Sequence, residues 1–523
     1  MLRILFVLIL ILLNAWWDAV GLMTGQMRPS TVSLFVNAFA CLFLLAVVNR
    51  LSQLVFRPLF SNQTLTHFYI ALSVASALFG LDLLQPLLSV VAHPVWFAGE
   101  GNDWDLTVLP HLPQQMVVWD KSSLRGFYTG LSSFNTPYVL SGWLGPLTWW
   151  GVFLLLLGGA LLCATFVLFP LWSRARLSFP IAQIPLRLLS QRENLFYQKV
   201  FWSGLGIAGL VNLINGLHFL YPNIPSLGGW LLDLSPYFPN RPLNAIGWTP
   251  ITILPFGIGL GFIMPVDLLL SSWVFYVVWK VERIVSAMTG WWGLPRFPYL
   301  EEQQFGAYIA FAVLSLAPLA ETWRWQKSFL AHPFTSAVGL DYAVGKNSTE
   351  RTRFAHNPWL LGFVFFFLCL LLLMWWQKMT LWLATLFFAG YFLVSIGIGR
   401  IRSQLGSPVH DLHFAGPDRI LVYIFGSQNL SPRDLSILSL FGGFNRAYRG
   451  HPFPHILEGL WLAEELSKEH NSEGLRNSKH TLPWRLTLES TIIGWIFGYI
   501  FGAWTLLTAS YRFGGRPWYG TEV

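Results

Sequence analysis

Ionisable side chains gather in residues 406–458 of a chain that is otherwise strongly apolar. The stretch combines histidines, carboxylates and arginines, namely His410, Asp411, His413, Asp418, Arg419, Arg433, Asp434, Arg446, Arg449, His451, His455 and Glu458. Ionisable groups are costly at membrane depth, so this cluster indicates a lined cavity or a platform at the membrane surface. A carboxylate in such a cavity could take up and release a proton or a cation, which is the chemistry of a coupled transporter.

The histidines of this stretch allow a second chemistry, metal binding. Imidazole and carboxylate are ligands that a transition metal accepts, and the candidates here are His410, His413, His451 and His455. Two prolines separate the last two of these, so they cannot share a regular helix face. The simpler alternative is that arginines neutralise the carboxylates, as buried charges usually require. That alternative pairs Arg419, Arg446 and Arg449 with Asp411, Asp418, Asp434 and Glu458.

Polar residues also lie inside apolar runs of the first half, where a hydrogen bond between helices is the simpler interpretation. Asp82 and Asp267 each stand close to a proline, Pro86 or Pro265, that interrupts a helix and leaves carbonyls open. Asn212, Asn215 and His218 are spaced by three and share one side of a helix. His218 could instead ligate a pigment or quinone, or be a satisfied core histidine. The predicted substrate or ion site comprises Asp82, Asp267, Asn212, Asn215, His218, Asp411, Asp418, Arg419 and Arg446.

Composition places the chain among polytopic membrane proteins. Of its 523 residues 54% are hydrophobic and 11% are charged, whereas soluble domains carry about 25% charged residues. The net charge of +8 comes from Lys and Arg in short loops between apolar runs, which favours the lipid bilayer over nucleic acid as the partner. The three cysteines lie within apolar runs and form no disulfide framework, and the sequence requires no cofactor.

Apolar runs of about 20 residues, the length that crosses a bilayer, predict an all-α protein with about ten transmembrane helices. The expected spans are 2–23, 31–48, 66–91, 147–172, 200–221, 251–279, 305–320, 359–376, 380–399 and 484–509. Two further runs, 420–425 and 435–444, are each too short to cross alone, which predicts a re-entrant or discontinuous helix. The connections 92–146 and 222–250 are expected to form external caps.

The charges of the loops predict how the chain is oriented. Residues 1–23 resemble a signal peptide without a cleavage site, so we expect an uncleaved anchor. Lys and Arg follow the second and fourth spans, which predicts a cytoplasmic N-terminus in the cytoplasmic (inner) membrane. After residue 300 the loop charges do not fit simple alternation, and the topology stays open. We expect membrane domains over residues 1–320 and 321–523, the second with a polar and basic stretch at 406–485.

Two glycine patterns have different interpretations. The G-x-G-x-x-G at residues 204–209 matches a dinucleotide fingerprint, but it lies inside an expected span with no strand before it, so helix packing is preferred. A double G-x-x-x-G at residues 494–502 puts three glycines on one helix face. That spacing predicts a close approach of two helix backbones.

Five short runs resemble an uncharacterised family of bacterial and archaeal polytopic membrane proteins. They are Gly-Pro-Asp-Arg at 416–419, Phe-Asn-Arg-Ala-Tyr-Arg at 444–449, His-Pro-Phe-Pro-His at 451–455, Phe-Pro-Ile-Ala-Gln-Ile-Pro-Leu at 179–186 and Glu-Glu-Gln-Gln at 301–304. The family is classified as two adjacent domains of unknown function, and its architecture is distantly similar to the oligopeptide transporter family. The resemblance covers most of the chain, implies no binding residue, and predicts further membrane segments beyond the last span.

We therefore expect a secondary transporter, coupled to an ion or a proton and similar to oligopeptide transporters, that moves a small molecule or a peptide. Substrate would enter between Asp82 and Asp267 on one side and residues 418–434 on the other. Two alternatives stay open. One is a membrane-embedded enzyme that acts on a lipid-linked substrate, although nothing in the sequence fixes a nucleophile. The other is a structural subunit of a larger membrane complex, and self-association into a homo-oligomer is open as well.

Overall fold

The computed structural model describes residues 2–25, 29–32, 34–55, 57–175, 177–190, 195–227, 232–252, 255–325, 357–407, 410, 412, 414–472 and 482–515. Most of these residues are helical, which confirms the expected all-α class; the described strands are β1 (Leu232–Asp233) and β2 (Pro250–Ile251), an antiparallel pair. The chain divides into a main unit, Met1–Leu177, Glu301–Ser403 and Pro408–Val523, and an inserted unit, Ser178–Leu300 and Gln404–Ser407. These boundaries do not coincide with the expected division at residue 320, which stays a prediction.

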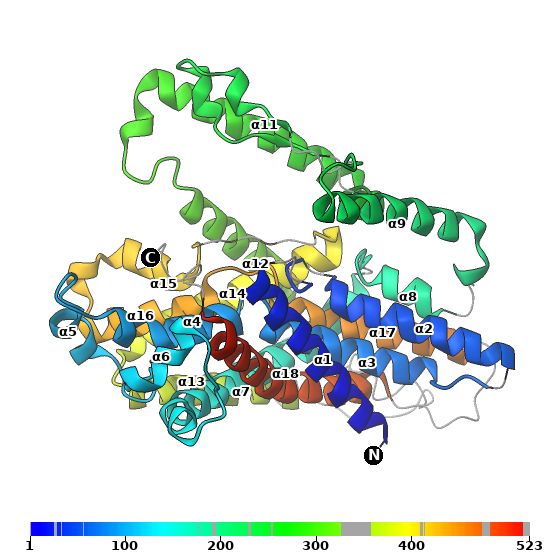
Figure 1. The fold of residues 1–523 in the computed structure, drawn as a ribbon, viewed down its shortest axis with the longest axis horizontal. Helices are drawn as coiled ribbons and strands as arrows, with labels where there is room; N and C mark the ends of the chain where they lie inside the picture. The colour runs from blue at the N-terminus through cyan, green and yellow to red at the C-terminus, as the bar shows by residue number, and fades with distance from the viewer. Residues whose placement is uncertain are drawn as a thin grey trace. The chain divides into compact units, whose positions relative to one another are not determined.

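The main unit is built from helices of both ends of the chain (Figure 1). Before the inserted unit they are α1 (Leu2–Thr24), α2 (Val36–Val55), α3 (Asn62–Phe79), α4 (Leu84–Phe97), α5 (Trp104–Thr107), η1 (Leu109–His111), α6 (Lys121–Thr129) and α7 (Pro137–Arg174). After it they are α12 (Leu300–Trp325), α13 (Pro358–Trp376), α14 (Leu381–Leu405), α15 (Pro417–Phe425), η8 (Ser427–Asn429), α16 (Pro432–Asn445), α17 (Pro452–Ser472) and α18 (Pro483–Phe513). The last helix, α18, packs against α1 and α3.

Eight described helices are long and apolar enough to cross a bilayer, and they correspond to eight of the expected spans. They are Arg3–Thr24, Val36–Val55, Asn62–Phe97, Pro137–Ser173, Lys199–Leu220, Pro358–Trp376, Leu381–Leu405 and Pro483–Phe513. The other two expected spans, 251–279 and 305–320, are not among the eight, although residues 255–263 and 266–279 of the first and residues 305–320 are helical.

Glycines of α18 set its close contact with α3. A Cβ added at Gly498 would lie 2.8 Å from the Cα of Ala75, and one added at Gly502 would lie 2.6 Å from the Cβ of Phe79. At Gly494 the neighbouring atom is the carbonyl oxygen of Ala71. The expected close approach of two backbones is therefore confirmed, because no larger side chain fits at these positions without moving α3.

A break separates α3 from α4 within one candidate span. Asp82 lies in this break, and Pro86 stands in the first turn of α4, where a helix needs no N–H donor. The break frees the carbonyl of Phe79, which accepts a hydrogen bond from Gln85 Nε2 at 3.3 Å. The same nitrogen donates to Asp18 Oδ2 at 2.5 Å, and Ser30 donates to Asp18 Oδ1 at 2.7 Å. Buried side chains thus satisfy the polar groups that the break exposes.

The two short apolar runs of the polar stretch form α15 and α16. At 9 and 14 residues, they are about 14 Å and about 21 Å long, whereas a bilayer core is about 30 Å thick. Pro417 and Pro432 begin the two helices, and Ser431 caps α16 by accepting the N–H of Asp434 at 3.1 Å. Neither helix can cross a membrane by itself.

The inserted unit holds two long helices, α9 (Lys199–Leu220) and α11 (Val266–Thr289). Its other elements are α8 (Gln183–Leu189), η2 (Leu195–Tyr197), β1, η3 (Ser235–Tyr237), η4 (Leu243–Ile246), β2, α10 (Pro255–Ile263) and η5 (Trp291–Gly293). No residue of α9 is buried, and apolar side chains such as Trp202 and Phe219 are exposed. A Cβ added at Gly204, Gly206 or Gly209 would meet no described atom within 4 Å. The helix packing expected for these glycines is therefore not found in the described part of the chain.

Candidate functional site

A cavity of about 360 Å³ lies within the main unit between α4, α15 and α16. We call it the helix cavity. Its wall is apolar where α4 contributes Pro86 and Val90 and where α16 contributes Leu435 and Leu438. Its polar lining comes from the polar stretch, namely Asp418, Arg419, Tyr423, Ser439, Asn445 and Arg446. Three of the predicted site residues, Asp418, Arg419 and Arg446, therefore line one cavity.

Asp418 is the carboxylate of the helix cavity. It stands in the first turn of α15, and its Oδ1 accepts a hydrogen bond from Asn445 Nδ2 at 2.5 Å. The side-chain oxygen of Asn445 in turn accepts the hydroxyl hydrogen of Tyr448. Burial raises the pKa of the Asp418 carboxyl to about 6, and the nearby Arg419 guanidinium offsets part of that effect. Asp418 can therefore change its charge near neutral pH.

The two arginines of the helix cavity share one aromatic ring. The guanidinium carbons of Arg419 and Arg446 lie 4.1 Å and 5.1 Å from the centroid of the Phe414 ring. The backbone N–H of Phe414 donates to the carbonyl of Arg446 at 2.9 Å, which fixes the ring beside the end of α16. Cation–π contact with Phe414 thus helps to position both arginines in the lining of the cavity.

Glu458 forms an ion pair away from the helix cavity, with an arginine that sequence reasoning missed. Arg402 Nε and Nη2 contact the two carboxylate oxygens of Glu458 at 2.5 Å and 2.8 Å. The expected pairing of Glu458 with Arg419, Arg446 or Arg449 is therefore wrong. Arg402 lies in the last turn of α14. An arginine at the end of an apolar run usually indicates a cytoplasmic loop, so the sequence pattern does not mark Arg402 as a partner of a buried carboxylate.

Burial favours the neutral form of two histidines of the polar stretch, His451 and His455. His455 stacks on Phe35 with ring centroids 4.4 Å apart, and burial beside Arg402 lowers its pKa well below the usual value. Burial lowers the pKa of His451 to about 3. His410 contacts the hydroxyl of Tyr308 at 2.9 Å.

Asp411 and His413 lie outside the described residues, and within the described part no three His, Cys, Asp or Glu side chains gather as metal ligands would.

Asp82 has fixed partners in the main unit. Its Oδ2 accepts the backbone N–H of Gly450 at 2.8 Å, and its Oδ1 lies 3.7 Å from Arg449 Nε. It does not belong to the lining of the helix cavity. Asp434 likewise has fixed partners, because it accepts from the backbone N–H and the hydroxyl of Thr380 at 2.8 Å and 2.6 Å. These carboxylates stabilise helix ends and turns of the main unit.

The remaining predicted site residues that the structure describes belong to the inserted unit. Asp267 is exposed in the first turn of α11. Asn212 Nδ2 donates to the carbonyl of Ala208 at 2.9 Å, and Asn215 Nδ2 donates to the carbonyl of Leu227 at 2.9 Å. His218 contacts the carbonyl of Ile224. The polar side chains of α9 therefore bind backbone of their own helix and of the turn after it.

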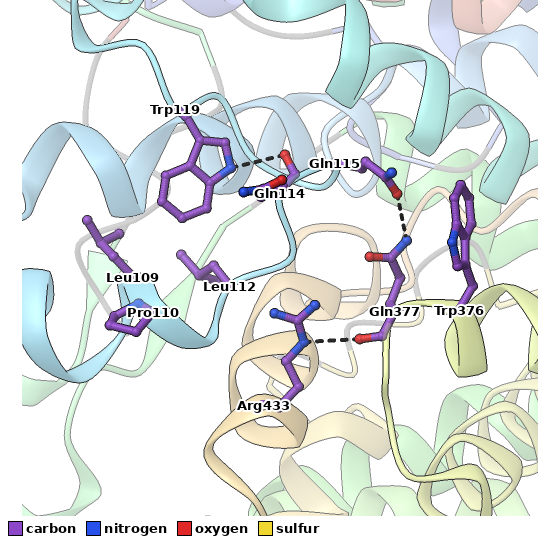
Figure 2. Close-up of a pocket in the computed structure, with 9 residues that line it drawn as sticks. All are labelled: Leu109, Pro110, Leu112, Gln114, Gln115, Trp119, Trp376, Gln377 and Arg433. Carbon is purple, nitrogen blue, oxygen red and sulfur yellow. Dashed lines mark hydrogen bonds between the residues drawn. The ribbon is translucent and has the colours of Figure 1, made fainter.

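A second, more open cavity of about 540 Å³ lies where the segment 109–119 meets the turn between α13 and α14. We call it the loop cavity. Figure 2 shows that its polar groups contact one another: Gln377 Nε2 donates to Gln115 Oε1 at 2.9 Å, and Arg433 Nε donates to the carbonyl of Gln377 at 3.0 Å. Arg433 Nη1 also donates to the carbonyl of His111 at 2.9 Å. Arg433 therefore joins two connecting segments to the start of α16.

Fold and site together define a class: an all-α protein with charged side chains buried inside its main unit and, in the part of the chain that the structure describes, eight helices long and apolar enough to cross a bilayer. The chain belongs to the family of unknown function DUF6785, whose model matches residues 2–522. Membership of an uncharacterised family, which the five sequence runs implied, is confirmed. No curated protein and no solved structure matches the chain, and the similarity to oligopeptide transporters stays a prediction.

Proposed function

We propose that this protein is a secondary transporter of the cytoplasmic membrane and that the helix cavity holds its substrate. The supporting observation is that this cavity lies beside interrupted helices: Pro86, just after the break between α3 and α4, lines it, and α15 and α16 flank it. Broken helices at a cavity are the usual substrate and ion sites of secondary transporters.

In this proposal α15 and α16 form a re-entrant pair that enters the membrane and returns on the same side. Their connection, residues 426–431, carries polar side chains that are exposed at residues 427–429, so in this proposal it faces water and not lipid. Together with the eight helices above, the pair α10 and α11 and the helix α12 bring the number of spans to about ten, as hydropathy predicts. The N-terminus is cytoplasmic, as the loop charges predict.

Asp418 is the best supported coupling carboxylate in this proposal. It faces the helix cavity, whereas Asp82 is paired with Arg449 and the backbone of Gly450, and Asp267 belongs to the inserted unit. A coupling group must gain and lose a proton or cation in different access states, and a carboxylate that lines a cavity can do so.

The test is uptake by the purified full chain in liposomes that contain a pH-sensitive dye. Small organic acids, amines, sugars and dipeptides are first screened for thermal stabilisation of the protein in detergent, and those that bind are added outside the liposomes. We expect at least one of them to enter together with protons. Binding without entry for every such compound contradicts the transporter and favours the enzyme or the structural subunit.

A matched pair of variants tests the position of the site. A Cβ added at Gly442 would meet only Asp418 Oδ2, at 3.7 Å, so the side chain of Gly442→Leu enters the helix cavity. This variant should lose uptake while it stays folded. Ser427→Leu, which adds a similar side chain at an exposed position of η8, should transport like the wild type.

A further inference from the structure

The charge of the helix cavity points to the kind of molecule that it holds. Its lining contains two arginines, Arg419 and Arg446, and one carboxylate, Asp418, so the lining carries a charge of +1 with the carboxylate ionised and +2 with it protonated. Both guanidiniums lie against the Phe414 ring. Two arginines in one lining favour an anionic ligand, because guanidinium groups bind carboxylate and phosphate oxygens.

The rest of the lining limits the size and polarity of that anion. Pro86, Val90, Val422 and Leu435 make part of the lining apolar. The volume of about 360 Å³ is near the lower end of the range for small-molecule sites, which is about 300–1,000 Å³. A two-chain phospholipid is too large for it. The ligand that fits has an apolar body and one anionic head.

We propose that the helix cavity binds a small water-soluble organic anion through Arg419 and Arg446, and that protonation of Asp418 strengthens this binding. The inference rests on the proposed function for its role in transport, and it supplies the substrate class. An ionised Asp418 competes with the anion for the guanidiniums. Protonation of Asp418 removes this competition, so proton and anion are bound together.

The groups that face Asp418 allow this change of charge. On its own helix the charged neighbour is Arg419, and from the end of α16 it faces Asn445, Arg446 and the hydroxyl of Tyr448 through Asn445. From α4 the cavity receives only the apolar Pro86 and Val90. From α12, Glu301 accepts a hydrogen bond at 3.1 Å from the hydroxyl of Tyr423, which lines the cavity. Burial raises the pKa of Asp418 to about 6, so anion affinity should increase as pH falls through that value.

Binding of three probes of equal size tests the charge preference without any transport. Phenylacetate, phenylacetamide and phenethylamine carry negative, no and positive charge, and each is titrated into the purified full chain in detergent by calorimetry at about pH 5 and about pH 8. We expect phenylacetate alone to bind, about tenfold more tightly at the lower pH. Equal binding of the amide or the amine overturns the inference, as does binding of a single-chain lysophosphatidate without binding of phenylacetate.

Variants separate the roles of the three charges. Arg419→Gln and Arg446→Gln should each weaken phenylacetate binding about ten- to hundredfold, because each removes a charge-assisted contact. Asp418→Asn should bind at both pH values as tightly as the wild type binds at the lower one. Arg125→Gln, at an exposed position of α6, controls for overall charge and should bind like the wild type. Unchanged affinity in both arginine variants overturns the inference.

The two proposals fail in different ways. Arginine-dependent binding of phenylacetate without uptake into liposomes leaves the anion site in place and removes the transporter. Uptake of a neutral or cationic compound that Gly442→Leu abolishes leaves the transporter in place and removes the anion site.

Discussion

The loop cavity and the helix cavity differ in what their polar groups contact. The loop cavity is larger, yet Arg433 donates to the carbonyls of Gln377 and His111, and the amides of Gln377 and Gln115 bind each other. In the smaller helix cavity the guanidiniums of Arg419 and Arg446 lie on an aromatic ring beside an apolar wall. An aromatic ring contacts the face of a guanidinium, whereas the N–H donors lie in the plane of the group. Volume is therefore a poorer guide to a binding site than the partners of the polar groups.

The carboxylates Asp82 and Asp418 repeat this difference. Asp82 accepts from the backbone of Gly450 and lies near Arg449, so its charge is matched within the fold. Asp418 accepts from a neutral amide, Asn445, and lines the helix cavity. In the first arrangement partners within the fold match the carboxylate, whereas in the second burial raises the pKa of the carboxyl and favours its protonated form.

The largest effect should come from the loop cavity, and it should concern stability. Arg433→Ala removes two charge-assisted hydrogen bonds to carbonyls, and we expect a loss of about 3 to 4 kcal/mol in the free energy of unfolding. Unfolding in detergent, followed by a probe of helix content, measures it. Phenylacetate affinity of the folded fraction should not change. If the affinity falls while stability holds, the two cavities have been assigned the wrong roles.

Asp418→Asn should stabilise the protein at high pH. The pKa of the Asp418 carboxyl is about 6 in the folded state, against an ordinary value of 3.8. The protonated carboxyl therefore makes its full contribution to the free energy of unfolding below pH 3.8, and this contribution is lost as pH rises through 6. The wild type therefore bears the cost of a buried carboxylate at about pH 8, and the variant should gain about 3 kcal/mol there. Near pH 4 the two should unfold alike. Equal destabilisation at both pH values would contradict the assignment.

Arg419→Lys tests whether the charge or the planar shape of the guanidinium in the helix cavity decides phenylacetate binding. Lysine keeps the charge but loses the planar group that lies on Phe414 and contacts an anion with two N–H donors, so we expect about tenfold weaker phenylacetate binding. Calorimetry compares this variant with Arg419→Gln, which should bind more weakly still. Equal losses in the two variants would show that geometry rather than charge decides, and a loss in neither would remove Arg419 from the site.

The smallest effect should come from Asp82→Asn. The amide oxygen can still accept the N–H of Gly450, and the lost charge faces Arg449 at 3.7 Å. The side chain of Arg449 is 25% exposed, so water can solvate its charge in the variant, and we expect a loss of about 1 kcal/mol in stability. Proton-coupled uptake should persist. Uptake that no longer responds to a pH gradient would make Asp82, and not Asp418, the coupling group.

Local patterns of the sequence predicted most of the helices and their interruptions. Apolar runs of spanning length match eight described helices, and the short runs near residues 420 and 440 became α15 and α16. The double G-x-x-x-G became the contact of α18 with α3. These features follow from the sequence alone because hydropathy, proline and glycine act through residues close together along the chain.

Only the tertiary structure decided which charges face a cavity. Asp82 contacts Arg449 and the backbone of Gly450, and Glu458 contacts Arg402 rather than an arginine of its own stretch. Asp418 and Asp82 look alike in sequence, since both precede or follow a proline in an apolar run. Their burial and partners depend on contacts between segments far apart in the chain, and no local pattern encodes such contacts.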